Sequence, residues 1–181
     1  VVGQPVAQGP VLLVANHISW LDIPVMHAAR FCRFVSKDDV RRWPLIGRLA
    51  TAAGTLYIAR SSRRDAHRMV HTIADSLRAG DVVAVFPEGT TSDGRVLLPF
   101  HANLLQAAIS AGVPVLPAAL RFVDAASGQT SFAPRYVDED SLFSSLWRTL
   151  RAPPLLAIVR FGEPQDSHAR ERREWAQALH T

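Results

Sequence analysis

The sequence is poor in cysteine and has no long apolar run, and each absence excludes a class of protein. Cys32 is the one cysteine among 181 residues, so no internal disulfide can form. Its place in the apolar run RFCRFVS favours a buried, inert thiol and weakly favours a reducing compartment. No window reaches the roughly 18 uninterrupted apolar residues of a spanning helix, so we predict no transmembrane segment here. The chain starts at Val1 rather than at methionine, and we expect a preceding segment that could carry a membrane anchor or a signal.

Lysine is almost absent. Of the 20 basic residues only Lys37 is a lysine; the others are arginines, whose planar guanidinium suits phosphate and carboxylate recognition. A net charge of +4 and an isoelectric point near 10.2 indicate anionic partners. The arginines are scattered, and no helix-turn-helix, zinc-finger or aromatic-rich RNA-binding signature is present, so nucleic acid ranks below an anionic lipid surface.

Several catalytic signatures are missing as well. The sequence contains no GxSxG, which disfavours a serine hydrolase. It has neither a P-loop nor the clustered ligand spacing of a zinc site. We therefore expect no bound metal and no cofactor.

Short apolar, β-branched runs alternate with longer amphipathic ones. The length and a hydrophobic content of 48% fit one domain, residues 1–181. We predict strands at residues 11–15, 31–36, 55–59, 82–86, 115–120 and 155–161. We predict helices at residues 23–30, 45–53, 63–79, 102–111, 141–150 and 169–179, and one long loop at residues 123–140. Strands separated by helices predict an α/β fold with a largely parallel mixed sheet flanked by helices.

A histidine and an aspartate follow the first predicted strand, in the stretch VLLVANHISWLDIP. His17 lies at the carboxyl end of the strand, where sites gather in open α/β sheets, and Asp22 begins the next helix. Five residues of helix turn by about 500°, so a loop must bring the two side chains together. Asp22 would then accept one imidazole N–H and leave the other ring nitrogen free to take a proton. The structural alternative is that Ser19 and Asp22 form a helix-capping pattern, which requires no catalysis.

Three further stretches combine apolar strands with polar or rigid residues. In VVAVFPEGTTSDG, proline and glycine flank Glu88 and would make a rigid loop with exposed backbone N–H groups, or simply a solvated turn. In GTLYIAR, Arg60 ends a strand and could bind a phosphate, although such an arginine is more often a surface residue. VPVLPAAL is a buried strand whose prolines favour a structural role.

Taken in this order, the four stretches resemble the glycerolipid acyltransferase family, which includes the 1-acylglycerol-3-phosphate acyltransferases. The matching blocks are NHISWLD, GTLYIAR, FPEGT and VPVLPAAL, within residues 11–120. The resemblance implies a glycerol-3-phosphate acyltransferase-like fold, with His17 as the catalytic base and Asp22 as the residue that orients it. It also implies that the acceptor is bound by Arg60, Glu88, Gly89 and Thr90.

The resemblance further implies a reaction. A fatty acyl chain would pass from acyl-CoA or an acyl carrier protein to the hydroxyl of a lysophospholipid such as 1-acylglycerol-3-phosphate, giving phosphatidic acid. An alcohol attacks a thioester poorly until a base such as His17 takes its proton, and backbone N–H groups near Gly89 are the expected oxyanion donors. Phosphatidic-acid-forming members often continue EGTRS, whereas this chain reads EGTTS. Lyso-ornithine lipid or another lysolipid therefore stays an alternative acceptor, and a noncatalytic lipid-binding domain is the alternative of another class.

One segment has the composition of a membrane contact. RRWPLIGRL, residues 41–49, sets a tryptophan and aliphatic side chains among arginines, as in segments that lie at a lipid interface. The alternative is an ordinary amphipathic helix packed on the sheet. We expect the protein at the cytoplasmic face of the inner membrane, peripheral or anchored through its N-terminal segment. Its partners would be the lysolipid, the acyl donor and the membrane surface, without nucleic acid.

Overall fold

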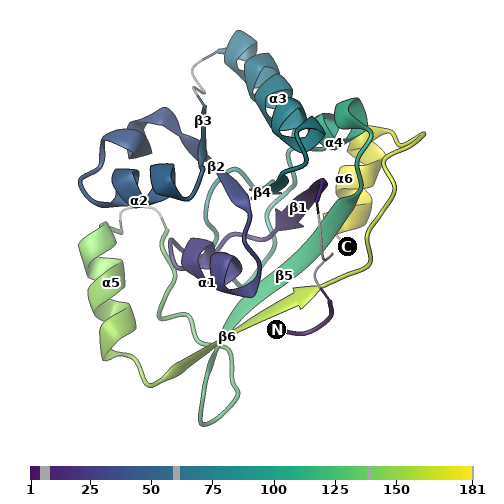
Figure 1. Cartoon of the computed structure of the whole chain (residues 1–181). Coiled ribbons are helices and arrows are strands. Elements are labelled where there is room, and N and C mark those ends of the chain that lie inside the picture. The colour runs from purple at the N-terminus through teal and green to yellow at the C-terminus, as the bar shows by residue number, and fades with distance from the viewer. Residues whose placement is uncertain (5–8, 59–61, 138–139, 181) are drawn as a thin grey trace.

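One mixed sheet organises the molecule (Figure 1). The computed structural model describes residues 1–4, 9–58, 62–137 and 140–180. Within these ranges a six-stranded sheet has the order β3-β2-β4-β1-β5-β6. Its strands are β1 (Val11–Ala15), β2 (Arg33–Lys37), β3 (Leu56–Ile58), β4 (Val82–Val85), β5 (Val115–Asp124) and β6 (Leu155–Phe161). Neighbouring strands run parallel except β5 and β6, which are antiparallel. The predicted α/β fold with a largely parallel mixed sheet is confirmed.

The helices connect the strands as the alternating pattern predicted. They are α1 (Asp22–Ala29), α2 (Ile46–Ala52), α3 (Arg63–Arg78), α4 (Leu105–Ala111), α5 (Leu142–Arg151) and α6 (Arg172–His180), with a 3-10 helix, η1 (Asp38–Arg42), that the sequence did not predict. In the described part of the chain no helix is both long and apolar enough to cross a membrane.

The element boundaries lie within four residues of those predicted, and two of the differences have clear physical reasons. Strand β5 continues four residues past the predicted end at 120, because it pairs with β6 as far as Asp124 opposite Leu155. Helix α6 begins at Arg172 rather than at 169, because Ala169 has a positive φ of 57° and cannot lie within a right-handed helix. The carboxylate of Glu171 then accepts hydrogen bonds from the N–H groups of Arg173 and Glu174 and starts the helix.

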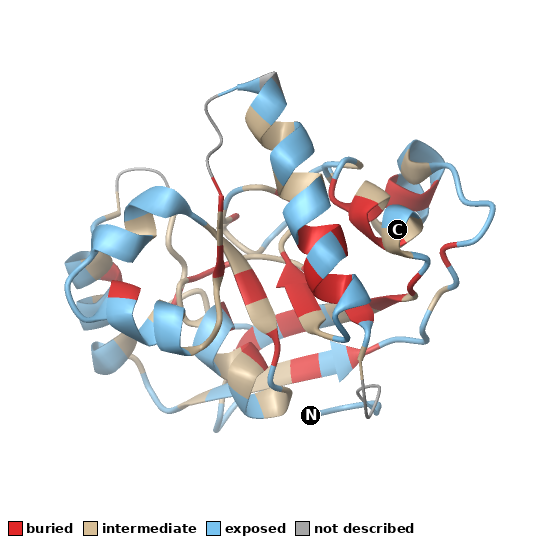
Figure 2. Ribbon diagram, turned by 45° about the horizontal axis from the view of Figure 1, so that its top comes forward, coloured by how far each residue is buried: buried red, intermediate tan, exposed pale blue. Residues whose placement is uncertain are grey.

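The core lies on both faces of β1, whose five residues are all buried (Figure 2). Alternate side chains point to opposite faces of a strand. Leu12 and Val14 accordingly join a cluster with α3, α4 and α6, and Leu13 joins a second cluster that includes Met26 of α1. Cys32 is buried in that second cluster, as predicted.

This arrangement places two candidate blocks side by side. Strands β1 and β4 are parallel neighbours, with Val14 opposite Val85. Their carboxyl ends therefore lie at the same edge of the sheet, where loops of α/β proteins commonly form binding sites. The NHISWLD turn follows β1 and the FPEGT loop follows β4, so these blocks meet at this edge.

Candidate active site

The turn between β1 and α1 brings His17 and Asp22 together. His17 Nδ1 lies 2.8 Å from Asp22 Oδ2. The same carboxylate oxygen accepts the N–H of Ile18 at 2.6 Å and that of Ser19 at 2.9 Å. The capping alternative is formed in part, because Ser19 Oγ accepts the N–H of Leu21 at 3.1 Å and Asp22 accepts that of Ser19, although the helix begins at Asp22 with Leu21 as its N-cap residue. Asp22, which is fully buried, holds both the turn and the imidazole with one oxygen.

Two interactions fix the imidazole of His17: stacking against an aromatic ring and the hydrogen bond with Asp22. It stacks on Phe86 with 3.9 Å between ring centroids and 5° between planes, and Phe86 stacks in turn on Phe34. A carboxylate has only acceptors, so the hydrogen bond with Asp22 requires the proton to lie on Nδ1. Nε2 then keeps its lone pair, on a side chain that is 19% exposed. This arrangement suits a base that takes a proton at Nε2.

Glu88 holds the main chain of the turn that carries His17. Its side chain is buried, Oε1 accepts the N–H of His17 at 2.7 Å, and Oε2 accepts the N–H of Leu98 at 2.9 Å. Burial raises the pKa of Glu88 above its ordinary value, and the two backbone hydrogen bonds partly offset that rise. The resemblance implied that Glu88 binds the acceptor. The geometry favours a different role, that of a positioning residue, because both carboxylate oxygens are bound to backbone.

Gly89 and Thr90 occupy the turn after Glu88. Gly89 has a φ of +74°, and a Cβ built there would lie 2.8 Å from the ring of His101, so no other residue fits without strain. The Gly89 N–H donates to Phe86 O at 3.1 Å. The Gly89 N–H is therefore already bound within the turn. To donate to an oxyanion, it would have to break its hydrogen bond with Phe86 O. Thr90 is exposed at the edge of the site, where the sequence placed an acceptor-binding residue.

Two positioning residues were missed by the sequence analysis. The amide of Asn16 accepts the N–H of Leu120 at 2.7 Å and donates to Leu120 O at 3.0 Å, which ties the end of β1 to β5. The N–H of Ser92 donates to His17 O at 2.8 Å. Asn16 lies inside the block NHISWLD, and Ser92 follows the block FPEGT. This proximity to the identified blocks is the sequence feature that could have indicated both residues.

The predicted long loop packs beside the turn that carries His17. Ser19 Oγ donates to Pro134 O at 2.5 Å, and the N–H of Tyr136 donates to Ile18 O at 3.0 Å. The hydroxyl of Thr91 in turn donates to Tyr136 O. Ser19 and Pro134 are 115 positions apart in the chain, so local pattern could not have revealed this contact.

The anion-binding part of the prediction stays untested. Arg60 lies outside the described residues. Arg95, which follows Gly89 by six residues and is a second candidate to bind a phosphate, is 66% exposed. Its guanidinium lies 5.3 Å from the ring centre of Phe132 and 3.8 Å from Asp93. Among the described residues no group of three His, Cys, Asp or Glu side chains is arranged to hold a metal ion. A cavity of about 340 Å³, lined by Asn16, Arg160 and apolar side chains that include Leu97 and Phe100, adjoins the site.

Comparison with known proteins gives three findings. The Acyltransferase family model matches residues 1–121. The chain is 41% identical over 162 residues to a 1-acyl-sn-glycerol-3-phosphate acyltransferase of Neisseria gonorrhoeae, covering 88% of this chain and 63% of that protein. It is 40% identical over 167 residues to a lyso-ornithine lipid O-acyltransferase of Pseudomonas aeruginosa, covering 92% and 64%. The chain thus spans less than two thirds of the length of either protein.

A solved structure has the same fold. The crystal structure of the 1-acyl-sn-glycerophosphate acyltransferase from Thermotoga maritima superposes with a TM-score of 0.66 at 22% sequence identity. The match covers 97% of this chain and 65% of that chain. At this identity the likeness establishes the architecture of the sheet and its helices.

Proposed function

The chain belongs to the Acyltransferase family, and from this premise we propose that it moves a fatty acyl chain from a thioester donor to the hydroxyl of a lysolipid. The observation that carries the proposal is the 2.8 Å contact between His17 Nδ1 and Asp22 Oδ2, which leaves Nε2 as a base. The donor is acyl-CoA or an acyl carrier protein. The favoured acceptor is 1-acylglycerol-3-phosphate, which would give phosphatidic acid.

In this mechanism His17 removes the acceptor's proton as the hydroxyl oxygen attacks the thioester carbon. A positioned base of this kind contributes about 10² to 10⁴ in rate. A C–O bond forms, the C–S bond breaks, and the imidazolium returns the proton to the departing thiolate. Asp22 stabilises the imidazolium through the Nδ1 hydrogen bond.

Other residues keep the base in place. Glu88 accepts the main-chain N–H of His17, and Ser92 donates to its carbonyl oxygen. The ring of Phe86 limits the rotation of the imidazole by stacking against it. Pre-organisation of this kind matters because reacting atoms must already be within about 3 to 3.5 Å and aligned before attack.

Lyso-ornithine lipid is the second candidate acceptor, and one specific observation supports it. Thr91 stands where phosphatidic-acid-forming members often have arginine, and its hydroxyl is bound to Tyr136 O. This position therefore offers no cation to a phosphate. The relatives named lyso-ornithine lipid O-acyltransferase include the Pseudomonas aeruginosa protein and one from Brucella abortus, 36% identical over 167 residues. We place the reaction, with either acceptor, at the cytoplasmic face of the inner membrane.

A product scan by mass spectrometry tests the proposal. The purified chain is given one fatty acyl chain as its acyl-CoA and, separately, as its acyl-carrier-protein thioester, each with a panel that includes 1-acylglycerol-3-phosphate and lyso-ornithine lipid. The His17→Ala variant is the matched control. We expect a diacyl product from one of these acceptors with the wild type and none with the variant. If no lysolipid is acylated, or if the variant forms the product equally fast, the chain is not the proposed enzyme; a noncatalytic lipid-binding domain would still bind the lysolipid.

A further inference from the structure

The segment around α2 presents apolar side chains to the outside. The exposed fractions are 42% for Trp43, 69% for Leu45, 37% for Ile46 and 61% for Leu49. The sequence left open whether this segment packs on the sheet as an ordinary amphipathic helix. The structure excludes that alternative for these four side chains.

Helix α5 presents a second apolar face, which the sequence analysis did not identify. The exposed fractions are 74% for Phe143, 37% for Leu146, 48% for Trp147 and 69% for Leu150. These positions follow a spacing of three and four residues, so the side chains share one face of the helix. The ring of Trp147 is nearly parallel to that of Phe143, and the guanidinium of Arg151 lies 4.6 Å from the centre of the Trp147 ring.

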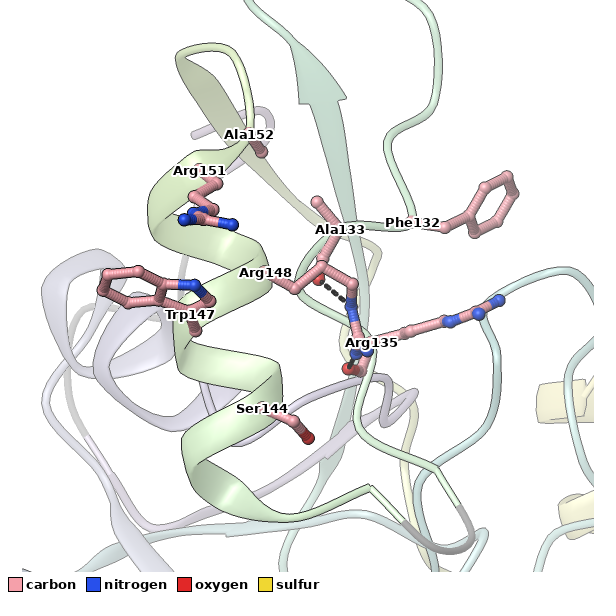
Figure 3. Close-up of a pocket in the computed structure, with 8 residues that line it drawn as sticks. All are labelled: Phe132, Ala133, Arg135, Ser144, Trp147, Arg148, Arg151 and Ala152. Carbon is pink, nitrogen blue, oxygen red and sulfur yellow. Dashed lines mark hydrogen bonds between the residues drawn. The ribbon is translucent and has the colours of Figure 1, made fainter.

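Helices α2 and α5 lie on the same side of the molecule. Figure 1 places α2 and α5 together at one end, away from α6, and Figure 2 keeps them on that side after the turn of the view. Figure 3 shows that Trp147 and Arg148 leave α5 in opposite directions, Arg148 toward the segment around Ala133. One face of α5 is thus held by the protein, while the face that carries Trp147 is left outside.

The two segments themselves carry charge of one sign, although Asp38 and Asp39 directly precede the first and Asp140, which is paired with Arg148, directly precedes the second. Residues 40–64 contain no aspartate or glutamate, and neither do residues 141–160, yet both stretches are rich in arginine. Arg41, Arg42 and Arg48 accompany the first face, and Arg151 accompanies the second. Aromatic and aliphatic side chains interleaved with arginine are typical of segments that lie in the interface of an anionic bilayer.

We propose that the exposed faces of α2 and α5 form one membrane-docking surface, which binds a bilayer containing anionic phospholipid. We call it the α2–α5 surface and define it by Trp43, Leu45, Ile46, Leu49, Phe143, Leu146, Trp147 and Leu150. The apolar side chains would enter the acyl boundary, and the arginines would meet the phosphates of the headgroups. This inference rests on the proposed function for its purpose, since a lysolipid acceptor resides in such a bilayer.

The surface is linked directly to the catalytic turn. Trp20, inside the NHISWLD block, donates through Nε1 to Ser145 Oγ on α5 at 3.2 Å. Ser145 Oγ donates to Arg135 O at 3.0 Å, and Arg148 binds Ala133 O at 2.9 Å. Docking of α5 on a bilayer would therefore set the position of the turn that carries the base.

The groove beside α5 extends the surface toward the interior. It has a volume of about 670 Å³ and lies between α5 and the segment from Phe132 to Arg135, with Arg148 and Arg151 among its lining (Figure 3). Guanidinium groups bind phosphate through paired hydrogen bonds. Arg148 is already paired with Asp140 through Nη1 and Nη2 at 3.1 and 3.0 Å, so Arg151, which lies over the ring of Trp147, is the guanidinium that would meet a headgroup phosphate.

Co-sedimentation with vesicles tests the proposal without donor or acceptor. The wild-type chain is compared with the triple variant Phe143→Ser, Trp147→Ser, Leu150→Ser, and with Val96→Ser as a control at an exposed apolar residue outside the surface. Vesicles are made of phosphatidylcholine alone or mixed with phosphatidylglycerol. We expect the wild type to bind the mixed vesicles, the triple variant to bind them at least about tenfold more weakly, and the control to bind like the wild type.

Charge reversal gives a second arm. Arg151→Glu should weaken binding to the mixed vesicles by about fivefold or more, because each basic residue near an anionic surface contributes on the order of a factor of five. Arg173→Glu on α6, far from the surface, should leave binding unchanged. Unaltered melting temperatures would show that the variants stay folded.

The results separate this inference from the proposed function. Vesicle binding by a chain that acylates no lysolipid would support the docking surface and refute only the function. Absence of vesicle binding by the wild type, or equal binding by the triple variant, would overturn the docking surface even if a dispersed acceptor is acylated. A wild type that is dimeric without lipid, and a triple variant that is monomeric, would also overturn it, because the surface would then join two copies of the chain.

Discussion

Two substitutions of Asp22 separate its proposed catalytic role from its structural role. Asp22→Asn removes the charge of the side chain, and Asp22→Ala removes the hydrogen-bond acceptor as well. In Asp22→Asn, the carbonyl oxygen of the amide can replace Oδ2, since three N–H donors, those of His17 Nδ1, Ile18 and Ser19, point at this position. The opposite orientation would direct an NH₂ group at these donors. The variant therefore keeps the turn and loses the negative charge.

The size of the effect follows from that difference. A hydrogen bond to a charged group contributes about 1.5 to 3 kcal/mol and a neutral one about 0.5 to 1.5, so the imidazolium loses on the order of 1 to 2 kcal/mol. We expect Asp22→Asn to lower kcat/KM by about tenfold, within a factor of a few, as this free energy implies. Asp22→Ala instead leaves two buried N–H groups, of Ile18 and Ser19, without an acceptor. At about 1 to 3 kcal/mol each, this is a large part of a typical free energy of unfolding.

Thiol release from the acyl donor measures the activity, and urea unfolding measures the stability. We expect Asp22→Asn to lose activity while keeping most of the unfolding free energy, and Asp22→Ala to lose both. If Asp22→Asn keeps full activity, the carboxylate serves only to hold the turn, and the orienting role is refuted. Wild-type stability in Asp22→Ala would show that the hydrogen bonds to Oδ2 are not what holds the turn.

Arg60, Cys32 and Asp81 provide independent checks. Arg60→Ala should raise the apparent Michaelis constant for an anionic lysolipid by about ten- to a hundredfold, because a charged hydrogen bond of about 1.5 to 3 kcal/mol is lost, with lysine a poor substitute; if only Arg95→Ala has this effect, Arg95 is the anion-binding residue. Burial raises the pKa of the Cys32 thiol to about 12, so the native chain should resist iodoacetamide at neutral pH and react only when unfolded; rapid native alkylation would contradict the burial. The Ser76 hydroxyl and the Arg33 guanidinium hold the pKa of Asp81 below its ordinary value, so this carboxylate stabilises the fold above its ordinary pKa and loses that effect as the pH falls. The stability deficit of Asp81→Asn in urea unfolding should therefore shrink as the pH is lowered; a deficit independent of pH would exclude this linkage.

Local patterns in the sequence were sufficient to predict the helices and strands and the contact between His17 and Asp22. The bounds of β1 and β6 were predicted correctly, because apolar runs define both strands, with Arg160 as the one polar residue in β6. His17 and Asp22 stand five residues apart, so one short turn determines their contact. Such short-range features depend on backbone geometry that the adjacent residues control.

The support of the site depends on contacts between distant segments, which local patterns do not contain. Glu88 reaches the N–H of His17 across 71 positions, and Asn16 reaches Leu120 across 104. A glutamate in the sequence does not indicate whether its carboxylate binds a ligand or accepts a hydrogen bond from a backbone N–H. For that reason the sequence predicted acceptor binding for Glu88, whereas the geometry favours a positioning role.

The same limit applies to the surface of α5. The spacing of Phe143, Trp147 and Leu150 predicts an amphipathic helix with one apolar side. It does not predict whether that side meets the core or the outside, since both give the same periodicity. Only the packing of Arg148 and Ser145 against the neighbouring loop shows which face is held by the protein.

The general-base role of His17 is the central claim, and thiol release by His17→Ala tests it most directly. The variant and the wild type are compared with the same acyl donor and lysolipid, and the melting temperature and lysolipid binding are measured on the same samples. The proposed mechanism predicts a rate at least about a hundredfold lower in the variant, with fold and binding intact. Near-normal turnover by His17→Ala would contradict it.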